Sequence, residues 1–153
     1  MLCRAEILRF SPQNTPMNIV GIAGFATITG DSTASAALYR DMFKLQLKQQ
    51  DDYLYTDDME GAKHFGVWTL QMAAQSCFGR DVWPSDIPTP QATIEFELSD
   101  IASVDAAVIE MKENGYHFIH ESRLEPWGQT LARFMSPEGL LIGLSYAPWH
   151  HQS

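Results

Sequence analysis

The sequence predicts an α+β fold built from two similar halves, each made of one strand, one helix and three further strands. Two observations lead to this prediction. A segment rich in β-branched residues is followed by a helix-capping aspartate twice, at Asp31 and at Asp100. Between these two patterns, Pro84, Pro88 and Pro90 exclude both a helix and a regular strand. We therefore expect one domain over residues 18–147, with module one at 19–79, a linker at 80–90 and module two at 91–147.

Module one begins with a glycine-rich, β-branched strand at 19–29. Apolar residues at helical spacing after Asp31 predict a helix over about 33–44. Two more runs, at 47–55 and 63–74, have the composition of strands, and a polar turn around Gly61 separates them. We therefore expect His64 and Trp68 to lie on the last strand of this module.

Module two repeats the order. A strand at 93–98 precedes a helix over about 101–114, which buries Val104, Ala107, Val108 and Met111. Asn114-Gly115 ends this helix, because glycine adopts the left-handed backbone without steric cost. A strand at 116–119 and a hairpin of strands 129–135 and 140–146 complete the module. Pro137 and Gly139 predict a type I turn in that hairpin.

The chain ends and the composition limit the class of protein. Residues 1–17 are expected to form an arm, with a possible edge strand at 5–10, and residues 148–153 a solvated tail that includes His150 and His151. A net charge of −9 argues against nucleic acid and membrane partners. Cys3 and Cys77 form no disulfide pattern, and no secretory signal is evident, so a reducing, cytoplasmic location is expected.

Three blocks of the sequence carry a family resemblance. They are Ile28-Thr29-Gly30-Asp31 with the later Leu38–Phe43, then Phe96–Ile101 leading to Asn114-Gly115, and finally Pro126-Trp127-Gly128-Gln129 with Phe134–Gly139. Over about 19–146 the chain resembles the glyoxalase/bleomycin resistance/extradiol dioxygenase superfamily, also called vicinal oxygen chelate proteins, and in its last block the bleomycin-resistance branch. Two departures are Lys44, where the family usually has a glycine, and Leu38, where it has an aromatic residue.

The resemblance implies paired βαβββ modules that curl into a half-open mixed sheet with a cavity inside, and commonly a homodimer. It also implies four metal-ligand positions, and the residues found there are poor ligands. The positions fall on Gly24, on Thr93 (or Ile94 if the register slips) and on Gly143, with Gln71 an uncertain fourth. Glycine has no side chain to offer, so we expect neither a metal ion nor another cofactor.

Aromatic residues and a few polar ones remain as candidates for a ligand site. We expect a cavity lined by Trp68, Gln71, Trp127 and Arg133, with Glu95 as polar anchor and His64 at the rim. Core packing is the alternative for Trp68, and an ordinary half-exposed strand position is the alternative for His64. An inward Gly143 would widen this cavity, whereas an inward Arg133 would favour a ligand that bears a carboxylate.

Two functions of different classes follow. The first is metal-independent binding of a small molecule, a resistance-type sequestration of a cationic or aromatic compound. The second is an enzyme of the same fold: a lyase, isomerase or dioxygenase. It would need a metal ion held by other residues, or acid–base chemistry by Glu95, Glu97 or His64.

Overall fold

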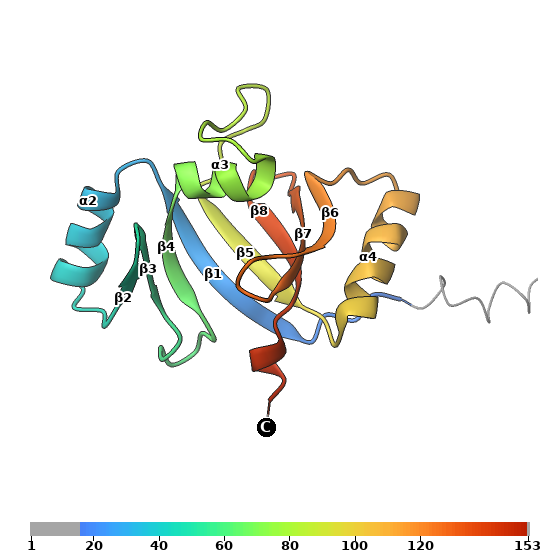
Figure 1. Ribbon diagram of the computed structural model, residues 1–153, viewed down its shortest axis with the longest axis horizontal. Helices are drawn as coiled ribbons and strands as arrows, with labels where there is room; N and C mark the ends of the chain where they lie inside the picture. The colour runs from blue at the N-terminus through green and yellow to red at the C-terminus, as the bar shows by residue number, and fades with distance from the viewer. Residues whose placement is uncertain (1–15, 153) are drawn as a thin grey trace, which may run out of the picture.

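An eight-stranded mixed sheet forms the centre of the protein in this computed structural model, which describes residues 16–152 (Figure 1). The strand order is β2-β3-β4-β1-β5-β8-β7-β6, so each module contributes four neighbouring strands. The modules meet at β1 and β5, which pair antiparallel, while β1 with β4 and β5 with β8 pair parallel. The strands are β1 (Gly21–Thr29), β2 (Lys48–Gln50), β3 (Tyr53–Thr56), β4 (Phe65–Thr69), β5 (Ala92–Glu97), β6 (His120–Leu124), β7 (Thr130–Met135) and β8 (Leu141–Tyr146). The predicted α+β class is confirmed.

Helices surround the sheet at its two sides and at both ends of its strands (Figure 1). They are α2 (Ser32–Ala36), which continues as the π-helix η2 (Ala37–Met42), α3 (Leu70–Phe78), α4 (Ile101–Glu113) and the short 3-10 helix η3 (Pro148–His150). None of the helices within residues 16–152 is long and apolar enough to cross a membrane.

The helix of module two is built as its sequence predicts. Asp100 accepts a hydrogen bond from the backbone N–H of Ser103 at 2.7 Å and so caps α4. Val104 and Val108 of this helix pack with Leu98 and Leu144 in a fully buried cluster. Burial of this apolar stripe against the sheet is the main stabilising term for module two.

Module one departs from its prediction at two strands. The strand expected at 63–74 is wrong: β4 ends at Thr69, whose hydroxyl accepts a hydrogen bond from the N–H of Met72 at 3.1 Å and starts α3. Alanine, methionine and glutamine favour helix there, and α3 packs Ala73 and Ala74 against Trp83 of the linker. The strand expected at 47–55 is split into β2 and β3, because Asp51 has a left-handed backbone with φ of 54°.

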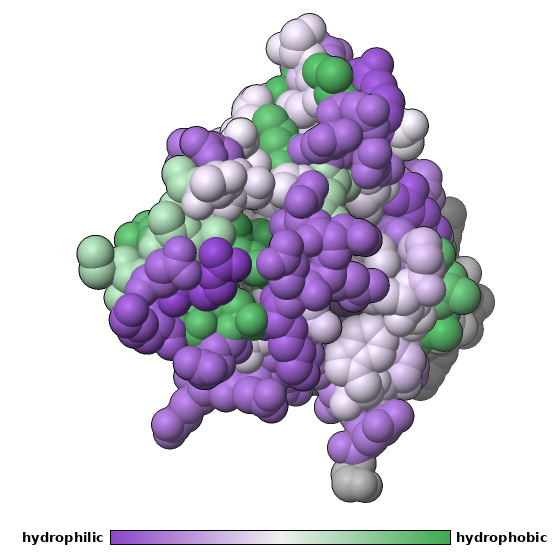
Figure 2. All heavy atoms as spheres, turned by 60° about the vertical axis from the view of Figure 1, so that its left-hand side comes forward, coloured by the Kyte–Doolittle hydropathy of each residue, from purple (hydrophilic) through white to green (hydrophobic). Residues whose placement is uncertain are grey.

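Two smaller predictions also differ from the structure. The strand expected at 116–119 begins only at His120, because the N–H of Tyr116 still donates to the carbonyl of Met111 and closes α4. The edge strand expected at 5–10 lies outside the described residues. In Figure 2, which turns the α2 side forward, hydrophobic atoms lie between hydrophilic ones on the surface. Leu38, Met42 and Phe43 of the first helix are among the exposed apolar residues.

Candidate ligand-binding cavity

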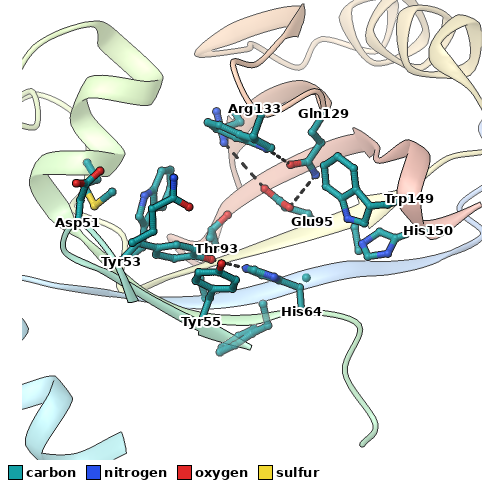
Figure 3. A pocket seen from close by; sticks show the side chains of 18 residues that line it. Asp51, Tyr53, Tyr55, His64, Thr93, Glu95, Gln129, Arg133, Trp149 and His150 are labelled. Carbon is teal, nitrogen blue, oxygen red and sulfur yellow. Dashed lines mark hydrogen bonds and ion pairs between the residues drawn. The ribbon is translucent and has the colours of Figure 1, made fainter. Parts of the chain in front are cut away.

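A cavity of about 360 Å³ lies on the inner face of the sheet and takes side chains from both modules (Figure 3). This volume is in the range of small-molecule sites. The aromatic residues of its lining are Phe25, Tyr53, Tyr55, Trp68, Trp127 and Trp149, and the polar ones are Gln50, Asp51, His64, Thr93, Glu95, Gln129, Arg133 and His150. The cavity therefore joins broad aromatic walls to a few polar groups.

Five of the six residues expected from the sequence lie around this cavity: His64, Trp68, Glu95, Trp127 and Arg133. Gln71 does not belong to this lining. It is an exposed residue of α3, since the chain leaves the sheet at Thr69. Its expected place on a cavity-lining strand is therefore wrong.

The sheet register locates the four metal-ligand positions that the family resemblance implies. Gly24 and Thr93 each stand seven residues before the capping aspartate of their module, and both line the cavity. Glu95, five residues before Asp100, lies beside Gly143 on β8. The equivalent residue of module one, five residues before Asp31, lies beside Gly66 on β4. The fourth position is therefore Gly66, and three of the four are glycine.

Neighbouring side chains fill the space above these glycines. A Cβ atom added to Gly24 would lie 3.3 Å from the Cβ of His64, and one added to Gly66 would overlap the ring of Tyr53. A Cβ on Gly143 would lie 3.1 Å from Glu95 and from Leu131. The expectation that Gly143 widens the cavity is therefore wrong, because Glu95 and Leu131 occupy that room.

The side chains at these positions do not match the needs of a divalent ion. A stable site requires three or four donor side chains around one point, and three of these four positions have no side chain. Within residues 16–152 no three His, Cys, Asp or Glu residues are grouped so that they could hold a metal ion.

A hydrogen-bonded chain of three residues runs along the module-one wall. Asp57 Oδ1 lies 2.7 Å from Nδ1 of His64, and Nε2 of His64 is hydrogen bonded to the hydroxyl of Tyr53. Because Nδ1–H of His64 donates to the Asp57 carboxylate, Nε2 of the neutral ring accepts from the Tyr53 O–H. Burial and the nearby Glu95 carboxylate raise the pKa of Tyr53 well above its usual value. Tyr53 is thus a neutral phenol whose hydrogen is already bound.

Arg133 lies in the module-two wall and is almost fully buried, with 1% of its surface exposed. Its Nη1 donates to Glu125 at 3.0 Å and to Ser76 at 2.9 Å, and its guanidinium lies over the ring of Trp68. Glu95 approaches its Nη2 only to 4.0 Å. Glu125 is therefore the close anionic partner of Arg133, while Nε of this arginine has no hydrogen-bond partner within residues 16–152.

A second chain of hydrogen bonds links the cavity mouth to the core. The indole N–H of Trp127 donates to Gln129 at 2.7 Å, and the Gln129 amide donates to Glu95 at 3.0 Å and to Ser145 at 2.7 Å. Ser145 in turn donates to buried Glu97 at 2.7 Å. These contacts hold the Glu95 carboxylate in place and leave Trp127 half exposed, with 50% of its surface open to solvent.

The C-terminal segment contributes to this site, so the expectation of a solvated tail is wrong for His150, which lines the cavity, whereas His151 is exposed. His151 lies 2.8 Å from Oε2 of Glu97, and that carboxylate also accepts from the N–H of Ala147 at 2.6 Å. This anchor places Trp149 and His150 in the cavity lining (Figure 3). Burial lowers the pKa of His150. The signal available in the sequence was the apolar Ala147-Pro148-Trp149 run directly after the last strand.

The expected ligand-binding residues did not include Tyr53, Thr93 or Gln129, although Thr93 was expected at a metal-ligand position. Strand alternation in Tyr53-Leu54-Tyr55 was a usable signal, since it places both tyrosines on one face with Leu54 buried on the other. The partner of Tyr53 comes from another strand, and a pattern within one segment does not reveal it.

The comparisons with known proteins agree with this fold. A family model described as the Glyoxalase/Bleomycin resistance protein/Dioxygenase superfamily matches residues 21–144. No curated protein matches the sequence. A superfamily member from Vibrio splendidus 12B01 is a similar solved structure, with 14% identity, 80% of this chain and 96% of that chain covered, and a TM-score of 0.52.

Two further solved structures are similar at the level of the fold. One is described as NAD-dependent benzaldehyde dehydrogenase from Legionella pneumophila, with 10% identity, coverage of 80% of this chain and 96% of that chain, and a TM-score of 0.54. The other is a Streptomyces coelicolor methylmalonyl-CoA epimerase variant in complex with 2-nitronate-propionyl-CoA, with 16% identity, coverage of 86% and 99%, and a TM-score of 0.50.

Proposed function

The chain belongs to the glyoxalase/bleomycin resistance protein/dioxygenase superfamily, and we propose that its cavity binds and sequesters one small aromatic cation without a metal ion. The observation that carries this proposal is the pairing of aromatic walls with the Glu95 carboxylate, on a floor where glycine stands at three of the four metal positions. Aromatic faces attract both flat rings and cations.

The charges around the cavity favour a cation over an anion. Glu125 already accepts from Arg133 at 3.0 Å and from Arg123 at 3.2 Å. Glu95 has one hydrogen bond, from Gln129, and Arg133 approaches it only to 4.0 Å, so its carboxylate keeps free capacity toward the cavity. The net charge of −9 over the whole chain acts in the same direction.

A thermal-shift screen tests the proposal directly. Aromatic compounds of matched size, in cationic, neutral and anionic forms, are compared for their effect on the melting temperature. A ligand of the folded state at about 100 times its Kd stabilises the protein by about 2.7 kcal/mol. We expect the cationic members to give the largest shifts and the Glu95→Gln variant to remove their advantage. Larger shifts with the anionic members would contradict the proposal.

Trp127 provides a second test because it is half exposed. Trp127→Ala should weaken the tightest compound of the screen by about tenfold through lost stacking, with little change in the melting temperature of the free protein. Trp83→Phe is the matched control, since Trp83 is buried between α3 and the linker and does not line the cavity. If Trp127→Ala unfolds the protein and Trp83→Phe does not, Trp127 is a core residue.

A metal-free isomerase or lyase is a second candidate, and one observation favours it. The Asp57–His64–Tyr53 chain and the Glu95 carboxylate provide acid–base groups at one cavity. Mass and NMR spectra of a bound compound recovered after long incubation separate the two functions. An unchanged compound supports sequestration, whereas conversion that His64→Gln abolishes supports the enzyme.

A further inference from the structure

The floor of the cavity, where the two modules meet, brings together three oxygen-bearing side chains. Thr93 and Glu95 are alternate residues of β5 and therefore face the same side of the sheet. Tyr53 reaches the same floor from β3, with its ring across Gly66. Figure 3 shows the three side chains directed toward one region of the cavity.

Thr93 is the most unusual of the three. Only 5% of its surface is exposed, yet its hydroxyl has no hydrogen-bond partner within residues 16–152. Buried hydroxyl groups in proteins almost always have a partner, because an unpaired one loses its hydrogen bonds to water without replacement. Since Thr93 lines the cavity, the missing partner is expected from a bound molecule.

Tyr53 offers that molecule an acceptor and no donor. Its O–H is bound to Nε2 of His64, and His64 is fixed in the accepting tautomer by Asp57. The free lone pair of the phenol oxygen therefore remains for the ligand.

Glu95 supplies the charge. Its Oε1 accepts one hydrogen bond from Gln129, and its Oε2 lies 4.0 Å from the Arg133 guanidinium, beyond hydrogen-bond distance. A carboxylate accepts about four hydrogen bonds, so capacity remains on the side that faces the cavity.

We infer that the ligand carries a primary ammonium group, which donates its three N–H bonds to Glu95, Thr93 and Tyr53 while its aromatic part lies against the tryptophans. This inference rests on the proposed function and specifies the polar end of its ligand. An ammonium has three donors and one positive charge, as these three acceptors require. A quaternary ammonium has no N–H, and an alcohol has a single O–H donor and no charge, so neither satisfies this floor.

Four probes of one shape test the inference by titration calorimetry: 2-(1-naphthyl)ethylamine, its N,N,N-trimethyl derivative, 2-(1-naphthyl)ethanol and 3-(1-naphthyl)propionate. We expect the primary amine to bind about tenfold or more tightly than the trimethyl derivative and the alcohol, and the carboxylate to bind most weakly. The trimethyl derivative keeps the charge and the ring, so its deficit measures the N–H donors alone.

Two variants locate the contact. Thr93→Val keeps the shape of the side chain and removes the unpaired hydroxyl, so we expect a higher melting temperature of the free protein together with about fivefold to tenfold weaker binding of the amine. Tyr53→Phe should weaken the amine by a similar factor. Tyr55→Phe is the matched control, because Tyr55 stacks on His64 beside Tyr53 and belongs to the same wall.

The outcomes separate this inference from the proposed function. If the trimethyl derivative or the alcohol binds within twofold of the amine, the ammonium site is wrong while the cavity remains a binding site. The same conclusion follows if Thr93→Val affects the amine no more than Tyr55→Phe does. If none of the four probes binds, both the ammonium site and binding of aromatic cations are wrong.

Discussion

The helices of the two modules begin alike and continue differently. Asp31 caps α2 through the N–H of Ala34 at 3.0 Å, as Asp100 caps α4 through Ser103 at 2.7 Å. α4 then runs as a regular helix of 13 residues and buries three of them. The first helix has five α-helical residues, changes to a π-helix and buries none. A capping residue therefore fixes where a helix starts, and packing against the sheet decides how regular it becomes.

This difference assigns the modules different tasks. Because α4 packs in a buried cluster with Leu98 and Leu144, we expect module two to be the more stable half of the protein. Module one contributes the Asp57–His64–Tyr53 chain to the cavity. The first helix of this module, α2 with η2, buries none of its residues. Three experiments test this division, from the largest expected effect to the smallest.

Removing apolar volume should affect the two modules very differently. Leu98→Ala in the module-two cluster, where the leucine is 1% exposed, should lower the free energy of unfolding by about 2–5 kcal/mol. Leu38→Ala on the first helix, where the leucine is 43% exposed, should change it by less than about 0.5 kcal/mol. Urea denaturation of both variants measures this. Similar losses would show that α2 is packed as firmly as α4.

The two helix ends allow a reciprocal exchange. Lys44 follows the first helix with φ of 61°, and Gly115 follows α4 with φ of 89°, so both positions have a left-handed backbone. Lys44→Gly should stabilise the protein by about 0.5–1 kcal/mol, since a side chain is strained in this conformation. Gly115→Lys should destabilise it by about 1–2 kcal/mol, because open space around the added Cβ leaves backbone strain as the cause. Thermal denaturation compares the pair, and a destabilising Lys44→Gly would exclude strain at that end.

The smallest expected effect is on the pH dependence of the free energy of unfolding. Burial lowers the pKa of His120, which accepts from Nη1 of Arg133 at 3.2 Å in module two. A lowered folded-state pKa means that stability is complete above the unfolded value of about 6.5 and is lost as pH falls below it. The free energy of unfolding should therefore decline from pH 7 to pH 5.5, and His120→Gln should reduce that decline. His117→Gln, at an exposed position before β6, is the control and should leave the decline unchanged.

Local sequence signals predicted the parts of the fold that depend on neighbours in the chain. Asp31, Asp100 and Gly115 act as helix boundaries for reasons that lie within a few residues. The stretch after Thr69 was assigned wrongly, because a short apolar run is compatible with either a strand or a helix and its helical fate depends on packing against Trp83.

The sequence predicted which individual residues line the candidate site, but it did not predict the contacts between them. Strand alternation and residue composition predicted that Trp68, Glu95 and Trp127 line the cavity, and the structure places them there. They gave no indication that His64 would lie above Gly24, because that contact joins two strands distant in sequence. For the same reason the sequence did not indicate the hydrogen bond of His151 with Glu97. Contacts between segments require the sheet register, which the chain fixes only when it folds.

The central pairing of the sheet also sets the order in which the protein can fold. Phe25 pairs with Phe65 and Gly24 with Glu95, so β1 must wait for strands made much later in the chain. Pairings between distant segments lose much loop entropy before they gain contact energy, and such topologies fold slowly. Within its own module β1 pairs only with β4, and β5 pairs only with β8. The second neighbour of each strand is the other one, so neither module completes the sheet around the cavity alone. The cavity therefore requires both modules to be joined at β1 and β5.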